Sequence, residues 1–483
     1  MDEFGYRIVK RLTVNGRRLS IVRTTDDFLL RSDTKEHLLR LGLQLVPIES
    51  AIKLRVRYEM NDKHSDRLIC YVTSDGLYLL PDMETAIYDC GTFSVADILP
   101  FYNASVTANK YTTYENLLYL YEKKYTFRLS EKETISVLQE AEHYQHNNAK
   151  ALIERLKEIP IDWDKSDTII GVSDVLCDII RSGCYAESED TLNAINDNFQ
   201  SYIDTSYFAL HTASFLKRPK MVNRVLPYIA RHHERNEKVA LVVIDGMTYW
   251  QYLILDKSLL EEGIQTEKEM VFSWLPSITK LSRQAIFRGD MPSMQYVQTP
   301  NNEKKLWDEF WKNKRYMSHE TRYTHGSVVA DDFISLRQAF VDISLDEKMH
   351  SSSDNKDLYD LTVNWSKEVA GHIEDLYHHG YHIYITTDHG NLLAHGWRQL
   401  DNEEKTFLYE RESRGSRHLI YSKKEYMESF LKKNEDITDR LLVRDNWAVW
   451  REPQCFKTKD EITHGGAHFL EVVIPFISIE KKQ

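Results

Sequence analysis

Five short fragments carry side chains that could bind metal ions and attack a phosphoester. In chain order they are VVIDG with Asp245, WLPSITKLSRQAIFRG with Thr279, SLDEKMH with Asp346 and His350, ITTDHG with Asp388 and His389, and THGGAHFLEVVIP with His464. Mixed carboxylate and imidazole ligands suit zinc and also accept manganese. Two such cations can hold the attacking and the leaving oxygen of a phosphoester together. The fragments therefore predict a two-metal phosphoester hydrolase.

Thr279 is the expected nucleophile. A threonine hydroxyl attacks poorly near neutral pH unless it is activated, and a metal ion can do this. Thr279 follows Pro276 and opens the helical pattern KLSRQAIFRG, where it can act as N-cap and where the helix end favours negative charge. Taken alone, each fragment also fits a turn, a cap or a solvated helix start. Their joint order is what favours an active site.

Two of the fragments end continuous apolar runs. VALVVID ends at Asp245, and YHIYITTDHG repeats the plan at Asp388. Such runs are typical of strands buried on both faces of an α/β sheet, and ligands gather at the carboxyl ends of these strands. A helix is expected over 247–263, and further strands over 339–345 and 417–421.

The rest of the chain falls into two further regions. Residues 1–112 predict a small α/β module, with strands at 19–23 and 67–73 and a helix over KEHLLRLGLQL. Residues 113–237 predict a helical connector, because YENLLYLYEKKY, KETISVLQEAEHY and NNAKALIERLKEI have amphipathic helical spacing. The connector closes with a basic patch of Arg231, His232, His233 and Arg235. Residues 238–483 form the predicted catalytic domain.

Composition and charge narrow the functional class. The 483-residue chain carries a net charge of −12 and 42% hydrophobic residues, which argues against a nucleic-acid-coating protein. It has no apolar run long enough to span a membrane and no signal-peptide pattern at its start. Its five cysteines lack a CxxC pair, as expected of reduced thiols. A cytoplasmic location is therefore expected, with no membrane partner.

Residues 238–480 resemble a PglZ domain, a branch of the alkaline phosphatase superfamily. The fragments VVIDGM, LPSIT, DEKMH, TTDHG and HGGAHFLEVVIP carry the resemblance. It implies a mostly parallel sheet sandwiched by helices and two divalent metal ions, zinc first, with manganese or magnesium as alternatives. One metal would be held by Asp245, Thr279, Asp388 and His389, and the other by Asp346, His350 and His464.

PglZ proteins are known from BREX phage-defence systems, so the resemblance also implies defence partners. A phosphodiester substrate (an oligonucleotide, a cyclic nucleotide or nucleic acid) fits better than a monoester, because residues for a third metal are not evident. Lys280, Arg283 and Arg288 could meet phosphates or form an exposed helix face. His395 and His468 are either silent or substrate contacts. Isolated histidines are expected to be surface or core residues, among them His319, His378 and His382.

Rival functions remain open. The main alternative is a scaffold or assembly subunit of a defence complex, in which the metals are mainly structural. A phosphomutase needs a large insertion, and only about 66 residues separate Thr279 from Asp346. A sulfatase is disfavoured because no Cys-x-Pro-Ser-Arg sequence occurs. A DNA-binding module is disfavoured by the net charge and by the lack of a recognition motif.

Overall fold

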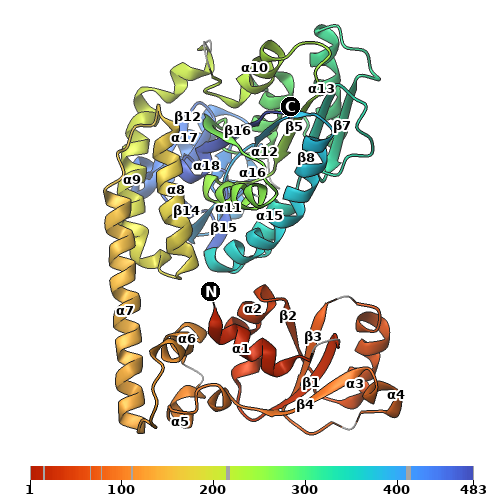
Figure 1. The fold of residues 1–483 in the computed structure, drawn as a ribbon. Coiled ribbons are helices and arrows are strands. Elements are labelled where there is room, and N and C mark those ends of the chain that lie inside the picture. The colour runs from red at the N-terminus through yellow and green to blue at the C-terminus, as the bar shows by residue number, and fades with distance from the viewer. Residues whose placement is uncertain are drawn as a thin grey trace. The chain divides into compact units, whose positions relative to one another are not determined.

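The computed structural model describes residues 2–14, 17–65, 67–77, 79–109, 112–213, 218–409 and 415–481. The chain divides into two compact units, Met1–Asn148 and Ala149–Gln483 (Figure 1). Among the described residues, no helix combines the length and the apolar character that crossing a membrane requires. The predicted division into residues 1–112, 113–237 and 238–483 stays a prediction.

The first unit is built around a four-stranded parallel sheet with the strand order β2-β3-β1-β4. The predicted strands are confirmed as β1 and β3. The elements of this unit are α1 (Glu3–Leu12), β1 (Leu19–Thr24), η1 (Phe28–Leu30), α2 (Ser32–Arg40), β2 (Leu43–Pro47), α3 (Ala51–Arg57), η2 (Tyr58–Asp62), β3 (Leu68–Thr73), α4 (Pro81–Glu84), β4 (Ile87–Phe93), η3 (Val95–Asp97), α5 (Ala104–Thr107) and α6 (Tyr114–Lys123).

The helix expected over KEHLLRLGLQL is wrong at its C-terminal end. The helix α2 stops at Arg40, and Gly42 then adopts a φ of +87°, a conformation that ends helices and favours glycine. The chain continues as β2, in which Leu43 and Leu45 are buried and Gln44 is half-buried. The apolar residues here follow the period of a strand, which the longer helical pattern concealed.

The connector helices are largely as expected. YENLLYLYEKKY forms α6, but the next two amphipathic stretches join in one long helix, α7 (Glu131–Lys157). Next come α8 (Ser166–Arg181), α9 (Tyr185–Thr205), η4 (Tyr207–His211), η5 (Val222–Arg224) and α10 (Val225–His232). Residues of α8 and α9 pack into the largest core of the second unit.

The second unit contains a six-stranded sheet with the order β6-β16-β9-β5-β8-β7. Five of these strands run in one direction and β16 runs opposite to them, which confirms the mostly parallel α/β fold. The elements around this sheet are β5 (Val239–Ile244), α11 (Tyr249–Glu261), β6 (Glu267–Phe272), α12 (Thr279–Arg288), α13 (Pro300–Asn313), β7 (Thr321–Gly326), β8 (Arg337–Asp342), α14 (Ser344–Ser351), α15 (Asn355–His378), β9 (His382–Thr386), α18 (Phe469–Val472) and β16 (Val473–Ile479).

The strand β5 shows why its sequence is continuously apolar. Ala240, Val242 and Ile244 pack into one core with residues of α8, α11 and α15. The alternate residues of β5 pack into a second core with α10, α12 and α13. Both faces of this strand are therefore covered by helices, as the sequence predicted.

A smaller lobe follows β9 and carries two three-stranded sheets, β14-β10-β15 and β11-β13-β12. Its elements are β10 (Leu392–Gly396), α16 (Asn402–Thr406), β11 (His418–Ile420), α17 (Lys424–Lys433), η6 (Glu435–Arg440), β12 (Leu441–Arg444), β13 (Trp447–Trp450), β14 (Gln454–Cys455) and β15 (Glu461–Thr463). The strand expected over 417–421 is β11. The strand expected over 339–345 is β8, and its last predicted residues instead begin α14.

Candidate metal centre and active site

The carboxyl ends of β5, β6, β8 and β9 point to one edge of the sheet, because these strands run in the same direction. The predicted metal ligands all follow such ends or lie in the segment after β15. They are Asp245 after β5, Thr279 at the start of α12, Asp346 and His350 on α14, Asp388 and His389 after β9, and His464 after β15.

Three of these residues form the Asp245 group, which consists of Asp245, Asp388 and His389. One ligand atom of each lies within 4.8 Å of the others. The His389 Nε2 is 3.7 Å from Asp245 Oδ1 and 3.7 Å from Asp388 Oδ2. All three side chains are buried.

Three more form the Asp346 group, which consists of Asp346, His350 and His464 and meets the same 4.8 Å limit. The His350 Nε2 is 3.4 Å from Asp346 Oδ1. Burial raises the pKa of Asp346, but hydrogen bonding and charge from His350 outweigh it and lower that pKa to about 2. Asp346 is therefore ionised at neutral pH, as a metal ligand must be.

The two groups adjoin each other. The His389 and His464 rings are stacked with centroids 3.9 Å apart and planes 11° from parallel. Between the groups runs the backbone of Gly246, whose φ is +73°. A Cβ there would lie 3.6 Å from Asp346 Oδ1 and 3.8 Å from His389 Cε1. The positive φ explains a glycine directly after Asp245, whereas a Cβ at these distances would make only ordinary van der Waals contacts.

Thr279 lies beside the Asp245 group, with its Oγ1 3.1 Å from His389 Nε2. The expectation that Thr279 caps its helix is wrong. Thr279 is the first helical residue of α12, and the N-cap position belongs to Ile278. The hydroxyl is therefore turned to the ligand groups instead of to the helix backbone.

Hydrogen bonds fix which nitrogen each buried histidine offers. The His389 Nδ1 is 2.9 Å from the Gly390 carbonyl oxygen, and the His464 Nδ1 is 3.2 Å from that of Ser277. Carbonyl oxygens only accept, so both Nδ1 atoms carry the proton and both Nε2 atoms keep a lone pair. Such outer partners orient histidine ligands in metal sites.

The electrostatics of the Asp245 group fit a cation. Burial, and next the charge of Asp388, raises the pKa of Asp245 well above its usual range. Burial likewise raises the pKa of Asp388. Among the described residues, the buried atoms Asp245 Oδ1 and Asp388 Oδ2 have no hydrogen-bond partner. Two crowded carboxylates with unpaired buried oxygens suit a divalent ion.

Arg283 is buried and forms ion pairs that the sequence did not predict. It is 3% exposed, so it does not belong to an exposed helix face. Its guanidinium donates to Asp245 Oδ2 at 2.8 Å and to Glu303 at 2.6 and 2.7 Å. Glu303 lies on α13 and is fully buried. Nothing in the local sequence around Glu303 signals this contact.

Other residues predicted near the substrate lie outside both ligand groups. The Lys280 ammonium is 5.2 Å from the centroid of the Tyr409 ring. The His395 Nδ1 is 3.0 Å from Asp460 Oδ2. The His468 Nδ1 accepts the Leu470 amide at 3.2 Å and caps α18. Their substrate roles stay predictions.

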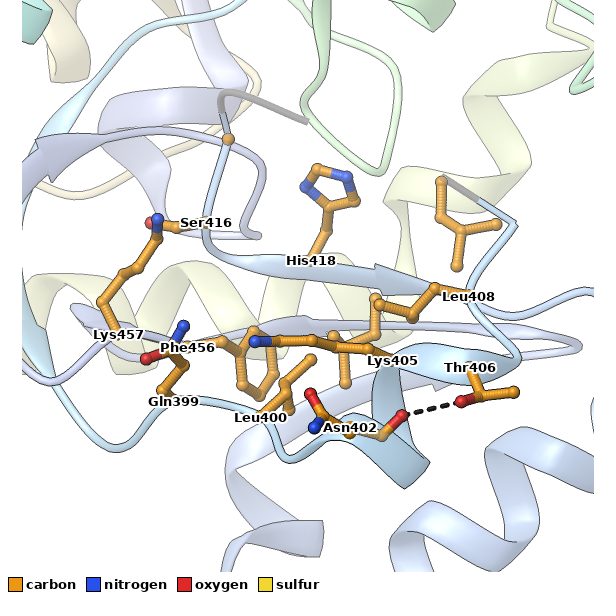
Figure 2. A pocket seen from close by; sticks show the side chains of 13 residues that line it. Gln399, Leu400, Asn402, Lys405, Thr406, Leu408, Ser416, His418, Phe456 and Lys457 are labelled. Atoms are coloured by element: carbon orange, nitrogen blue, oxygen red, sulfur yellow. Dashed lines mark hydrogen bonds between the residues drawn. The ribbon is translucent and has the colours of Figure 1, made fainter. Parts of the chain in front are cut away.

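A pocket of about 600 Å³ lies in the smaller lobe (Figure 2). Gly415 lines it, and a Cβ on Gly415 would lie 3.1 Å from His464 Cε1. The other lining residues mix cationic, polar and apolar side chains, namely Gln399, Leu400, Asn402, Lys405, Thr406, Leu408, Ser416, His418, Leu419, Ile420, Phe456 and Lys457. The volume suits a small organic group.

Part of the second unit matches a known protein family. Residues 224–479 match the model of the BREX system PglZ alkaline phosphatase-like domain. No curated protein matches the chain. Murine ectonucleotide pyrophosphatase/phosphodiesterase 5 is 12% identical, with 51% of this chain and 88% of that chain covered and a TM-score of 0.37. Phosphonoacetate hydrolase from Sinorhizobium meliloti 1021 with phosphonoformate is 11% identical, with 51% and 90% covered and a TM-score of 0.35.

Proposed function

We propose that this chain, which belongs to the PglZ family of BREX-system alkaline phosphatase-like domains, cleaves phosphodiesters with Thr279 as its nucleophile. Membership of this family supports a phosphoester hydrolase. The observation that carries this proposal is one contact. The Thr279 Oγ1 lies 3.1 Å from His389 Nε2, beside two groups of potential metal ligands.

Each ligand group would hold one divalent cation, with zinc as the first choice and manganese or magnesium as alternatives. When bound, the two cations would favour the ionised hydroxyl and offset the charge of the phosphate. The first cation would sit within the Asp245 group beside Thr279, and the second within the Asp346 group. The donor chemistry supports zinc, because each group combines carboxylate oxygen with imidazole nitrogen.

The chain's own residues position the reaction. The N-terminal end of α12 favours negative charge near Thr279. The Thr279 Oγ1 loses its proton to solvent and bonds to phosphorus, the bond to the leaving oxygen breaks, and that oxygen takes up a proton. Water then cleaves the phosphothreonine ester and restores the hydroxyl. Arg283 holds Asp245 in place through a buried ion pair.

The pocket lined by Gly415, a residue that packs against His464, supports a diester with an organic leaving group. It is large enough for a nucleoside, and Lys405 and Lys457 bring positive charge to its lining. These features favour an oligonucleotide or a cyclic nucleotide over a simple phosphate. We place the reaction in a cytoplasmic BREX-type defence system, where other defence proteins are the expected partners.

The test compares Thr279→Ala and Thr279→Ser with the parent on bis(4-nitrophenyl) phosphate and 4-nitrophenyl phosphate, with added zinc or manganese. Loss of the nucleophile should lower kcat by about 10³-fold or more, and serine should restore part of the rate. Thr299→Ala is the matched control, because Thr299 caps the start of α13 with its hydroxyl and should leave kcat near the parent value.

Turnover by Thr279→Ala at the parent rate would refute Thr279 as the nucleophile. The scaffold alternative makes a different prediction in cells. If phage restriction survives Thr279→Ala while the purified variant is inactive, the domain serves the defence system as an assembly subunit.

A further inference from the structure

A third cluster of potential metal ligands lies at the other end of the six-stranded sheet. It consists of His233 directly after α10, Glu237 just before β5, and His382 at the first position of β9. The parallel strands β5 and β9 begin at this edge, whereas Asp245 and Asp388 follow their opposite ends. The cluster is therefore separate from the proposed catalytic site.

The spacing of the three side chains suits a small cation. The His233 Nδ1 is 3.2 Å from Glu237 Oε2, and the His382 Nε2 is 3.7 Å from Glu237 Oε1. One ligand atom of each residue lies within 4.8 Å of the others. Tetrahedral zinc, with bonds of about 2.0–2.1 Å, sets its ligand atoms roughly 3.3 Å apart, so small adjustments would close the site.

The outer nitrogen of each histidine already has a partner. The His382 Nδ1 is 2.8 Å from Glu480 Oε2, and the His233 Nε2 is 2.8 Å from the Tyr384 hydroxyl. The Lys481 amide also approaches His382 Nδ1, but at 3.5 Å this contact is the weaker one. With Nδ1 as the donor to Glu480, His382 turns the lone pair of its Nε2 to the cluster, as histidine ligands of metals usually do. The His233 Nδ1 donates to Glu237 in this structure, and a bound metal ion would take the place of that proton.

An ion-pair network accounts for only part of this arrangement. Lys481 Nζ lies 3.6 Å from Glu237 Oε1, and His233 contacts the other carboxylate oxygen. His382, however, is only 7% exposed, and its buried Nε2 has no hydrogen-bond partner among the described residues. A buried polar atom without a partner is costly. A cation between the three side chains would satisfy it.

We propose that His233, Glu237 and His382 bind one zinc ion. Two imidazoles and one carboxylate are a donor set that zinc takes in proteins. The ion would tie the chain after α10 to the start of β9 and so stabilise this edge of the sheet.

The experiment measures zinc per chain by mass spectrometry after zinc loading and desalting of the full-length protein. His382→Ala should hold one zinc fewer than the parent, and so should the nearly isosteric Glu237→Gln, which guards against misfolding of the first variant. His232→Ala is the matched control, because His232 is exposed next to the cluster and should hold as much zinc as the parent.

A second readout separates this site from the catalytic one. Diesterase activity at 25 °C should stay near the parent value in Glu237→Gln, while the zinc-dependent rise in its melting temperature becomes smaller. Equal zinc content in parent, His382→Ala and Glu237→Gln would overturn the proposal, as would a parent chain that retains no zinc.

Discussion

The buried ion pairs of Arg283 permit a quantitative prediction for Arg283→Met. This variant leaves Asp245 and Glu303 without their shared cationic partner. The lost contacts are three hydrogen bonds of 2.6–2.8 Å, made by a guanidinium and two carboxylates that are almost fully buried. Removing one partner of such a pair costs about 3–5 kcal/mol.

The assay is thermal unfolding of the full chain in EDTA at pH 7.5. At about 2 °C per kcal/mol for a unit of this size, the melting temperature should fall by about 6–10 °C. Arg288→Met on the same helix is the control, because Arg288 is exposed and its loss should cost about 0.5 kcal/mol or less. Zinc should reduce the Arg283→Met deficit, since a cation would then offset Asp245.

An equal and small effect of both substitutions would refute this reasoning. It would mean that Asp245 is protonated in the folded protein and needs no cationic partner. The raised pKa of Asp245, caused by burial and then by Asp388, makes this a genuine alternative in the metal-free protein. The measurement therefore tests how the buried charges are neutralised.

Three further predictions concern the metal ligands, the pocket and the pH dependence of stability. Asp388→Asn should remove one metal equivalent and lower kcat by at least about 10²-fold, and an unchanged metal content would reject Asp388 as a ligand. Lys405→Ala should raise KM for a dinucleotide substrate and leave kcat for bis(4-nitrophenyl) phosphate unchanged. If the variant has the same kinetic constants as the parent on both substrates, Lys405 and its pocket have no role in substrate binding. Burial, then the charge of Arg444, lowers the pKa of His211 to about 4 from 6.5, so the unfolded chain takes up this proton first as the pH falls. The free energy of unfolding should therefore decrease between pH 6.5 and 4, and urea titrations at pH 7 and 5 should show a smaller decrease in His211→Phe.

The sequence predicted secondary structure best where a single hydrophobic pattern was present. The run before Asp245 has no polar residue, and both faces of β5 are buried, so its strand and the position of the following acid could be predicted. The same holds for β9 and Asp388. Around Gly42 the sequence fits both a helical and a strand pattern, because the apolar spacing changes from the period of a helix to that of a strand within a few residues.

Long-range contacts could not be predicted in this way. Arg283 and Glu303 are 20 residues apart on different helices, and each alone resembles an ordinary surface residue. The same applies to His233 and His382, which are brought together only by the pairing of β5 with β9. From the sequence alone, His382 is expected to be a surface or core residue, because its partners are distant in the chain.

The buried charges also bear on the choice between diester and monoester substrates. The two ligand groups, together with the Arg283–Glu303 pair that contacts Asp245, contain four buried acids (Asp245, Asp346, Asp388 and Glu303) and one buried cation (Arg283), so this set carries three negative charges. Two divalent cations would convert this to one positive charge. A phosphodiester, with one negative charge, would balance it, whereas a monoester carries nearly two at neutral pH. Exposed lysines enter this count weakly because solvent and salt screen them. The balance predicts a higher kcat/KM for bis(4-nitrophenyl) phosphate than for 4-nitrophenyl phosphate, and the opposite order would show that a further cationic group contacts the substrate.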